Sequence, residues 1–262
     1  MELESLLSYL DHLLKPKLFS DWCNNGLQVE GNGSIDRIAF AVSADANSID
    51  QAIEWKADAM IVHHGLFWKN SETELSNSLT GVFFKKRILP LIKENIHLLA
   101  YHLPLDANME VGHAATLARQ LEMQEIVPFA EEKNGSTIGV KGRFKVATTI
   151  ENLQKSLFKI LKHPIVVSSI GRESKINTKI KTAGIITGRA SSYWRVALND
   201  KLDAFITGEI SENDWSLAFE HGIHLFAGGH TATEELGLIS LIKKIETDLK
   251  VECKFIRSQN PI

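Results

Sequence analysis

Runs of apolar residues alternate with amphipathic segments along most of the chain. Leucines recur at helical spacing through Leu3–Leu14 and predict a helix with one buried face, which Pro16 ends. Short apolar runs between turn residues predict buried strands. In the first half the pattern predicts strands at Ile38–Val42, Ala59–Val62 and Ile96–Tyr101, and helices at Ser48–Lys56, Thr80–Asn95 and Gly112–Leu121. Strands that alternate with helices in this way indicate an α/β fold.

The middle of the chain has a different pattern, and no functional motif stands out in it between about residues 131 and 181. Lys133–Val146 is rich in Gly, Thr and Val with partial alternation, whereas Thr149–Leu161 has the spacing of an amphipathic helix. A further strand is expected at Val166–Ser169. The charged stretch Gly171–Lys181 is expected to be a loop.

Three segments of the second half resemble segments of the first half, in the same order. The pairs are Ala46–Ile49 with Ala190–Tyr193, Lys56–His64 with Lys201–Glu209, and Ile96–Ala100 with Ile223–Ala227. This repeat predicts duplicated three-layer α/β halves, residues 1–128 and residues 129–262, the second including the divergent middle segment. The alternative is that both halves are α/β and share only generic patterns.

In each half a histidine and an acid lie four residues apart after the third expected strand. These pairs are His102/Asp106 and His230/Glu234. Residues four apart share one face of a helix, so His230 and Glu234 could bind one metal ion if a helix starts there. Pro104 instead predicts a loop for the first pair. Gly228-Gly229, just before His230, allows a close backbone approach or an unusual φ.

The second expected strand ends in His63-His64-Gly65. Neighbouring strand residues point to opposite faces, so both imidazoles can serve one site only at the strand end, where Gly65 lets the chain turn. Ligands of open α/β sheets gather at the carboxyl ends of strands. Because His63-His64 and both His/acid pairs fall at such ends, we expect a metal site there, between the two halves.

The remaining histidines have no partner within motif reach. His97 and His224 precede apolar strands at matching positions and are expected to pack or to cap. The others are expected at the surface or just outside the site: His12, His113, His163 and His221.

The donor set limits which metals fit. The chain has 10 His and 2 Cys, so any metal ligands are nitrogen and oxygen atoms. Imidazole with carboxylate suits Zn, Fe, Mn, Co or Ni and disfavours a Cys-rich structural zinc site. Three His and two carboxylates are too many for one ion, so two divalent transition metal ions that share a carboxylate fit better, as in hydrolysis through a bridging water.

Composition excludes several classes of protein. The 262 residues include 29 basic and 32 acidic side chains, for a net charge of −3, and 44% are hydrophobic. This balance is that of a folded globular protein and gives little electrostatic help for nucleic acid, although Lys85-Lys86-Arg87 or Lys179-Ile180-Lys181 could form a local basic lining. No apolar run is long enough to span a membrane, and the acidic N-terminus lacks the basic start of a signal peptide. With Cys23 and Cys253 expected as free thiols, a cytoplasmic protein is predicted.

Five motifs together closely resemble the Nif-three-like family, whose bacterial members are called GTP cyclohydrolase I type-two homologues. The motifs lie at Asp21–Gly31, Val62–Lys69, His102–Ala107, Thr207–Glu209 and Gly229–Glu234. The resemblance runs from about residue 3 to residue 262. It implies a duplicated α/β fold with a dinuclear metal site and assembly with itself as a homohexamer, a toroid made as a trimer of dimers. The implied metal ligands are His63, His64, Asp106, His230 and Glu234.

Two residues beside these ligands, His102 and Glu209, are predicted to be catalytic, through substrate contact, proton transfer or support of a ligand. The function expected is a metal-dependent hydrolase acting on a nucleotide or a related small phosphate or cyclic-amide metabolite. Arg189, after an expected strand, could bind an anion or lie at the surface, and no Gly-x-x-x-x-Gly-Lys loop exists. The alternative is a non-catalytic metal-binding ring that acts as a regulatory or interaction protein, because a ligand set does not reveal turnover.

Overall fold

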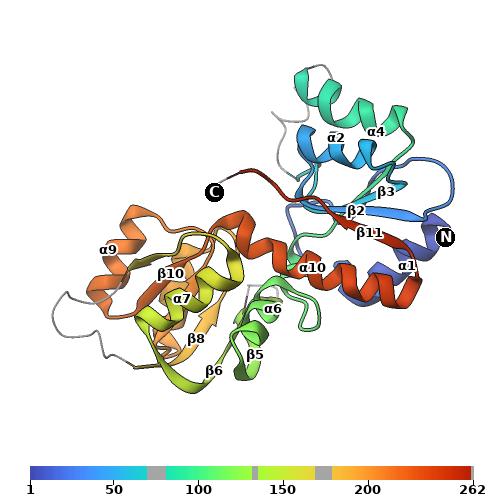
Figure 1. Cartoon of the computed structure of the whole chain (residues 1–262). Coiled ribbons are helices and arrows are strands. Elements are labelled where there is room, and N and C mark those ends of the chain that lie inside the picture. The colour runs from blue at the N-terminus through green and yellow to red at the C-terminus, as the bar shows by residue number, and fades with distance from the viewer. Residues whose placement is uncertain (70–80, 132–134, 169–178, 261–262) are drawn as a thin grey trace. The chain divides into compact units, whose positions relative to one another are not determined.

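The computed structural model describes residues 1–69, 81–131, 135–168 and 179–260 (Figure 1). Its contacts divide the chain into two units. Unit 1 contains Met1–Leu105 and Leu238–Gln259, and unit 2 contains Asp106–Gly237 and the last residues. This division differs from the expected boundary at residue 128. Helix α6 (His113–Gln120) packs on strands of unit 2, and the chain returns after Gly237 to add a strand to unit 1.

Unit 1 is built on a five-stranded mixed sheet. The strands lie in the order β1 (Gly26–Val29), β4 (His97–Ala100), β3 (Ala59–His64), β2 (Arg37–Ser43) and β11 (Glu252–Phe255). The four strands from β4 to β11 are parallel, and β1 runs antiparallel to β4. The three strands predicted in the first half are therefore confirmed as β2, β3 and β4.

The helices of unit 1 cover both faces of this sheet (Figure 1). They are α1 (Leu3–Leu14), the short 3-10 turn η1 (Pro16–Leu18), α2 (Ala46–Glu54), the π-helical η2 (Phe84–Ile88), α4 (Leu89–Lys93) and the C-terminal part of α10 (His230–Leu249). The predicted helix at Leu3–Leu14 is confirmed. Asp45 caps α2 by accepting a hydrogen bond from the Ser48 amide, so α2 begins two residues before the predicted start. Pro90 stands in the first turn of α4, where its missing N–H costs nothing.

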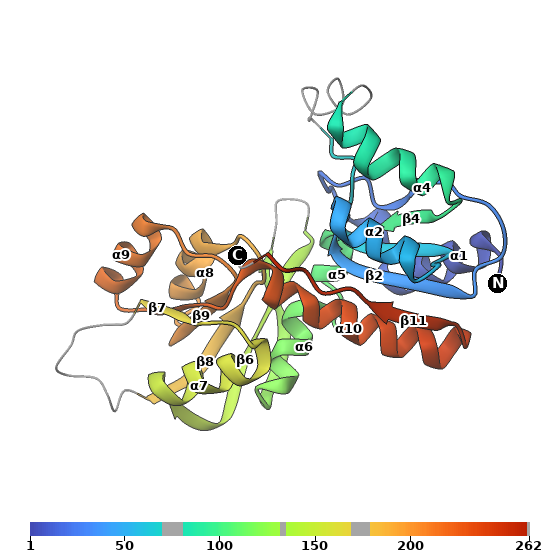
Figure 2. The ribbon, with the colours of Figure 1, turned by 45° about the horizontal axis from the view of Figure 1, so that its top comes forward.

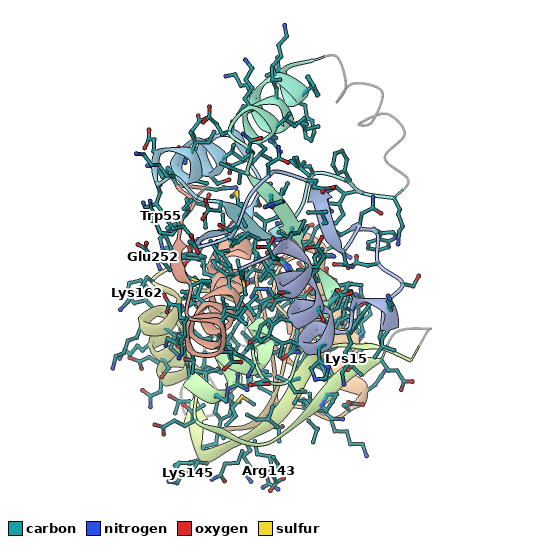
Figure 3. All side chains as sticks on the ribbon, turned by 90° about the vertical axis from the view of Figure 1, so that its right-hand side faces the viewer. Lys15, Trp55, Arg143, Lys145, Lys162 and Glu252 are labelled. Atoms are coloured by element: carbon teal, nitrogen blue, oxygen red, sulfur yellow. The ribbon has the colours of Figure 1, made fainter. Side chains whose placement is uncertain are left out.

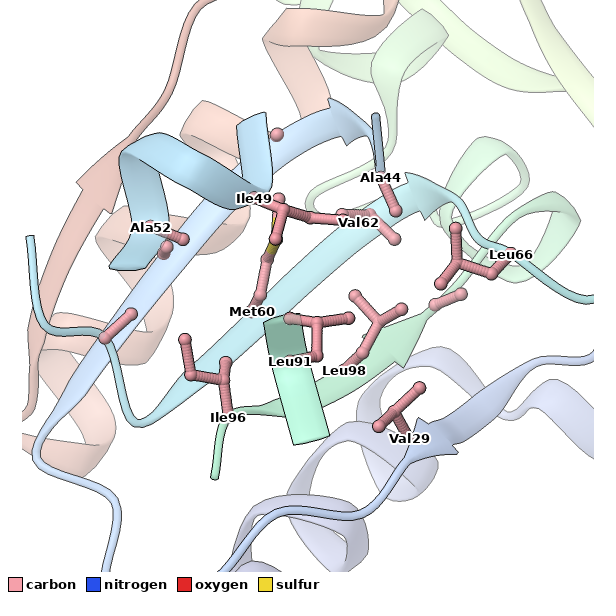
Figure 4. Close-up of a cluster of buried hydrophobic side chains, with 14 of the residues drawn as sticks. Val29, Ala44, Ile49, Ala52, Met60, Val62, Leu66, Leu91, Ile96 and Leu98 are labelled. Carbon is pink, nitrogen blue, oxygen red and sulfur yellow. The ribbon is translucent and has the colours of Figure 1, made fainter. Parts of the chain in front are cut away.

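The core of unit 1 explains why its strands are apolar throughout. Met60 and Val62 of β3 pack against Ile49 of α2 and Leu91 of α4 (Figure 4). Ala59 and Ile61, on the other face of β3, are equally buried. A parallel strand covered on both faces has no polar side to alternate, which is why these strands appear as short apolar runs in the sequence.

The last strand is tied to unit 1 by side chains as well as by the sheet. Arg37 of β2 pairs with Glu252 of β11 at 3.4 Å, and its guanidinium lies 4.3 Å from the centre of the Trp55 ring. Trp55 and Glu252, the two partners of Arg37, are labelled in Figure 3. The ion pair joins residues 215 positions apart (252 − 37), so no local pattern predicts β11.

Unit 2 is built on a six-stranded mixed sheet. The order is β5 (Met123–Glu131), β6 (Thr137–Thr149), β8 (Lys179–Ile185), β9 (Ala204–Thr207), β10 (His224–Ala227) and β7 (Val166–Ser168). Strands β8, β9 and β10 are parallel, and the other pairings are antiparallel. The predicted strand at 166–169 is confirmed up to Ser168. The loop expected at 171–181 lies mostly outside the described residues, and its end is wrong, because β8 already begins at Lys179.

The helices of unit 2 also lie on both sides of their sheet (Figure 2). Helices α6 and α7 (Ile150–Leu161) pack on one face, and α8 (Trp194–Asn199), preceded by the 3-10 turn η3 (Ser191–Tyr193), and α9 (Glu212–His221) lie on the other. The predicted helix at residues 149–161 is confirmed, with Thr149 as its N-cap. Helix α10 starts in unit 2 and ends in unit 1.

In each unit three successive parallel strands, β2, β3 and β4 or β8, β9 and β10, are linked by helices. The internal duplication itself stays a prediction, because that order is common in α/β proteins. No helix in the described ranges has the length and apolarity needed to cross a bilayer. Cys23 and Cys253 are free thiols, as predicted.

Candidate metal centre

Three imidazoles come together in unit 1 at the ends of β3 and β4. His63 and His64 are the last residues of β3, and His102 follows β4 by two residues. The ring centres of His63 and His64 lie 4.7 Å apart, those of His63 and His102 4.9 Å, and those of His64 and His102 5.8 Å. One ring nitrogen from each lies within 4.8 Å of the other two, which is a spacing that could hold a metal ion.

An oxygen atom holds the Nδ1 side of each of these three rings. Nδ1 of His63 lies 3.1 Å from the Tyr101 carbonyl oxygen, and Nδ1 of His64 lies 3.1 Å from the Ser43 hydroxyl. Nδ1 of His102 lies 2.9 Å from Oδ1 of Asp21. Because Nδ1 is engaged, Nε2 is the nitrogen that each ring can give to a metal. Metal-binding histidines are held in this way, by an outer oxygen that fixes the ring orientation.

Asp21 accepts hydrogen bonds from several groups besides His102. Its buried carboxylate also accepts hydrogen bonds from the amides of Cys23 and Leu103 and from the Asn25 side chain. Burial alone would raise the Asp21 pKa, but the hydrogen bond and charge of His102, with the bonds from Asn25 and Cys23, lower it to about 2. Sequence reasoning assigned no role to Asp21, because its contact with His102 spans 81 positions.

The strand end at Gly65 differs in one detail from expectation. The backbone of Gly65 does not have a positive φ. A Cβ there would lie 2.4 Å from the side-chain amide of Gln28 and 2.6 Å from Cβ of Ala100. Gln28 in turn accepts the amide hydrogens of Leu66 and Phe67 through its side-chain oxygen. Glycine is therefore required after His63-His64 for close approach rather than for a special turn.

Asp106 lies in a short helix and not in the loop that Pro104 predicted. Helix α5 spans Leu103–Asp106, and the Leu105 amide donates to the His102 carbonyl. Pro104 occupies the first turn, where no intrahelical partner exists for an N–H, so it starts the helix instead of breaking it. The prediction was wrong because it treated Pro104 as an interior residue. The Asp106 carboxylate accepts a hydrogen bond of 3.4 Å from the Thr187 hydroxyl, within unit 2.

The second His/acid pair lies where the spacing predicted. His230 is the first residue of α10, and its Nε2 lies 3.2 Å from Oε2 of the buried Glu234, one turn later. Its Nδ1 lies 2.5 Å from Oε1 of Glu209, which follows β9. The ring of His230 is thus held between two carboxylates, one of them a predicted ligand and the other a predicted catalytic residue.

These carboxylates govern the protonation of His230. Burial alone would lower the pKa of its ring, but the hydrogen bonds and charges of Glu234 and Glu209 outweigh burial and raise it to about 9. In the metal-free protein, a proton therefore occupies the position between His230 and Glu234 at neutral pH. A metal ion that binds there must displace it.

The strands of unit 2 bring their backbone close to this pair. Gly188 follows β8 with φ +64°, and a Cβ on it would lie 2.1 Å from Oε1 of Glu234. Gly229 has φ +92°, and a Cβ on Gly228 would lie 2.4 Å from the side chain of Leu161. Gly228-Gly229 was expected to allow a close approach or an unusual φ, and the two glycines show one of these each. Arg189, next to Gly188, is exposed.

The remaining histidines outside the candidate site differ in burial. Nδ1 of the buried His97 accepts the Gly31 amide hydrogen at 3.0 Å, and His224 is buried at the start of β10, so both are packing residues as predicted. His12, His163 and His221 are at least partly exposed. His113 is fully buried at the start of α6, where its Nδ1 accepts the Gly237 amide hydrogen, so a surface position for it is wrong.

The donor set fits divalent transition metals. Unit 1 supplies three imidazoles, and unit 2 supplies the carboxylates of Asp106 and Glu234 with the imidazole of His230. These are nitrogen and oxygen donors of intermediate softness, and neither cysteine is among them. The fold and these clusters define an α/β protein, with two mixed sheets, whose His, Asp and Glu side chains could hold metal ions.

Comparison with known proteins identifies the family. The sequence model of the Duf34/NIF3 (NGG1p interacting factor 3) family matches residues 1–261. A "GTP cyclohydrolase 1 type 2 homolog" of Pasteurella multocida (strain Pm70) is 38% identical over 261 residues, which cover 100% of this chain and 98% of that protein. A protein of the same name from Chlamydia pneumoniae is 37% identical over 100% of both chains. This chain belongs to the Duf34/NIF3 family, as the motifs predicted.

A solved structure shares the whole fold. It is described as protein ybgI of unknown function, is 30% identical in sequence and superposes with a TM-score of 0.89 over 100% of both chains. The likeness extends over both units.

Proposed function

We propose that this protein is a metal-dependent hydrolase with a dinuclear centre, which acts on a nucleotide or a related small phosphate or cyclic-amide metabolite. The proposed ligands are His63, His64, Asp106, His230 and Glu234. The observation that carries the proposal is how the three proposed imidazole ligands, His63, His64 and His230, are held. Nδ1 of each lies against an oxygen atom, of Tyr101, Ser43 and Glu209 respectively. Each ring would then bind a metal through Nε2, and metal-binding histidines are held by an outer oxygen in this way.

Two divalent ions would supply Lewis acidity and activate water near neutral pH. The proposed roles of the chain's own residues, Glu209 and His102, are to orient the ligands and to transfer protons. Glu209 holds the His230 ring so that its other nitrogen points to Glu234, and this contact supports a catalytic or supporting role for Glu209. His102 is the other residue proposed to be catalytic, and its place beside His63 and His64 supports a role at the same centre.

The exposed side chain of Arg189 supports the proposal that the substrate is an anion. Arg189 lies next to Gly188, which packs against Glu234, and its side chain is exposed. A guanidinium at this point can bind a phosphate in a bidentate manner. We also propose, on the resemblance to the family alone, that the chain assembles as a homohexamer. The two free cysteines support the proposal that it works in the cytoplasm.

Turnover by the metal-loaded protein tests the hydrolase proposal. The protein would be loaded with Zn²⁺, Mn²⁺, Co²⁺, Ni²⁺ or Fe²⁺ and incubated with nucleotides, phosphoesters and cyclic amides, while substrate loss is followed by mass spectrometry. Glu234→Gln and His64→Ala are expected to abolish any metal-dependent turnover, because each removes a proposed ligand. Glu212→Gln, an exposed acid on α9, is the matched control.

The alternative is a non-catalytic metal-binding ring. Protein that holds two ions per chain and consumes none of these substrate classes would contradict the hydrolase proposal and favour the alternative. Turnover that persists in Glu234→Gln would contradict the proposed ligand set instead.

A further inference from the structure

We propose that unit 2 has a binding site of its own for a small amphipathic anion, which is an apolar ring or chain that carries one acidic group. The site is a surface cavity between the end of α6, the second half of β6 and α7. All residues that line it belong to unit 2, and none of them is a proposed metal ligand. The proposal therefore goes beyond the hydrolase function and does not depend on it.

The cavity lies where β6 extends past the end of its neighbour β5. The pairing of these two strands starts with Met123 opposite Phe144, and β6 continues beyond this point to Thr149. Helices α6 and α7 both contact β6 (Figure 2). The space between them has a volume of about 650 Å³, which is within the range of roughly 300–1,000 Å³ that is typical of small-molecule sites.

The inner wall of the cavity is apolar. Leu153 belongs to the buried core of unit 2, and Leu121, Phe144 and Ile160 pack against that core. Val146 also lines the cavity, and its side chain is 77% exposed, the highest value for a large apolar side chain in the part of the chain that the structure describes. An apolar ligand group that covers Val146 and contacts the inner wall removes this surface from water, which is favourable.

Two lysines supply positive charge at the cavity. Strand β6 and helix α7 contain two lysines each, and in each element one lysine lines the cavity and the other does not. The two outside the cavity, Lys141 and Lys155, form ion pairs with carboxylates at 2.7 and 2.5 Å. The two that line it, Lys145 and Lys159, are exposed, and neither has a carboxylate partner in the described ranges. Lys145 is labelled in Figure 3.

The charge of the lining favours an anion. Glu122 is the one acid that lines the cavity, so the two lysines leave a net charge of +1 (2 − 1). The hydroxyl group of Ser156 adds a hydrogen-bond donor for an acidic group. Because ion pairs at exposed sites are weak, the apolar contacts supply most of the affinity and the lysines supply the preference for an anion.

Two fluorescent dyes test this site, because they share their rings and differ in the acidic group. Anilinonaphthalene sulfonate carries a sulfonate, and phenylnaphthylamine has the same rings without it. Each dye is titrated into the full-length protein, and its fluorescence gives the dissociation constant and the number of molecules bound. We expect about one site per chain for each dye, since cavities of this kind are few in a protein. The sulfonate is expected to bind more tightly than the neutral dye.

Substitution of the lysines tests the role of charge. Lys145→Gln/Lys159→Gln is expected to weaken binding of the sulfonate by roughly 3–10-fold, as for the loss of two exposed ion pairs, and to leave binding of the neutral dye unchanged. The matched control is Lys155→Gln/Lys162→Gln, which removes two exposed lysines that do not line the cavity. The control is expected to bind both dyes like the unmodified protein.

A bulky substitution tests the cavity itself. Ser156 is an exposed residue of α7 that lines the cavity, so Ser156→Trp is expected to fill the space and to prevent binding of both dyes. Phe158→Trp, at an exposed position of α7 that does not line the cavity, is the control and is expected to leave binding unchanged.

Three results would overturn the proposal: unmodified protein that binds neither dye, sulfonate binding that is equal in the two double lysine variants, or folded Ser156→Trp protein that binds both dyes unchanged. If Ser156→Trp fails to fold, the two lysine variants decide. Dye binding needs neither metal nor turnover, so failure of this proposal and failure of the hydrolase proposal are separate results.

Discussion

Each imidazole that we propose as a ligand is held by an oxygen atom on the side away from the proposed metal. His230 is the most strongly held, since Glu209 and Glu234 contact its two nitrogens. The buried packing residue His97 instead accepts one hydrogen bond, from the Gly31 amide. The two-sided contact of His230 therefore distinguishes it from a packing residue, and it has consequences for protonation.

Metal uptake is expected to release a proton from His230. Its pKa in the metal-free protein is raised to about 9, so the ring is charged at pH 7 and must lose its proton to bind an ion. Calorimetric titration with Zn²⁺ in buffers of different ionisation enthalpy measures the number of protons released. We expect about one more proton per chain at pH 7 from the unmodified protein than from His230→Ala, and equal release from the two would contradict this account.

The same pKa shift predicts how the stability of the metal-free protein varies with pH. A raised histidine pKa stabilises the fold below the unfolded value of 6.5, and this contribution is lost as the pH rises through about 9. His230→Ala is therefore expected to destabilise metal-free protein more at pH 6 than at pH 10, as measured by urea unfolding. If the loss in the free energy of unfolding is independent of pH, the carboxylates of Glu209 and Glu234 do not raise the pKa of His230.

A comparable prediction concerns Asp214, which is not one of the proposed ligands. Its buried carboxylate accepts hydrogen bonds from Ser191, Ser211, Trp194 and Arg195. Burial opposes ionisation, yet these bonds outweigh it and lower the Asp214 pKa from 3.8 to about 2. Asp214→Asn is expected to cost about 2 kcal/mol in the free energy of unfolding at pH 7.

Because the Asp214 pKa is lowered, its contribution is present above pH 3.8 and is lost as the pH falls through about 2. The variant and the unmodified protein should therefore converge near pH 2. Urea unfolding at pH 7 and at low pH checks this, with the exposed Asp50→Asn as control. A constant difference across this range would show that the bonds matter through packing and not through charge.

The ends of the parallel strands determine where the proposed ligands lie, and glycines make some of these ends possible. Gly188, after β8, leaves no room for a Cβ beside Glu234. Gly188→Ala is expected to push the Glu234 carboxylate away and to weaken Zn²⁺ binding by at least about 10-fold, an effect of the size seen when a partner of a ligand is lost.

Gly33→Ala is the matched control for that substitution. Gly33 also has a positive φ, +93°, but a Cβ on it would meet nothing within 4 Å. Both variants carry backbone strain on the order of 1–2 kcal/mol. Only Gly188→Ala should lose metal affinity, so equal Zn²⁺ affinity of the two variants would contradict the role of Gly188.

Most elements with a continuous apolar pattern could be predicted from the sequence. Strands β2, β3 and β4 are buried on both faces and appear as apolar runs, and α1 carries one buried stripe. Strand β5 was missed because it lies at the edge of its sheet, alternates weakly and contains Pro128, which a central strand would exclude. Strand β11 was missed because only its pairing with β2 makes it a strand.

The candidate site was predictable to the extent that its residues lie in short motifs. His63-His64 and His230/Glu234 could be found from spacing alone, because a strand end and a helical turn place them. Asp21 could not be found in this way, since its contact with His102 depends on how a distant loop folds. Its position in the motif that begins at Asp21 and includes Asn25 and Gly26 was the one available signal.

The whole chain folds as two α/β units, with helix α10 contributing to both. The boundary between them could not be predicted from repeats, because the last 20 or so residues return to the first unit. Since the chain matches its Duf34/NIF3 relatives over their full length, these relatives are the natural comparison for any measurement.

Assembly provides a separate prediction for the whole molecule. A homohexamer of 29.2 kDa chains has a mass of about 175 kDa. Light scattering after gel filtration is expected to find this mass, and a trimer of dimers should pass through a dimer on dilution. A monomer at all concentrations would contradict the proposed assembly without bearing on the metal ligands.

Metal content per chain tests the central claim most directly. Protein purified without chelators, or reloaded with Zn²⁺, is measured by elemental analysis together with His63→Ala/His230→Ala and the control His12→Ala/His221→Ala. We predict about two transition metal ions per chain in the unmodified and control proteins and none in His63→Ala/His230→Ala that still folds. Folded His63→Ala/His230→Ala protein with its full metal content, or unmodified protein that binds no metal, would contradict the account.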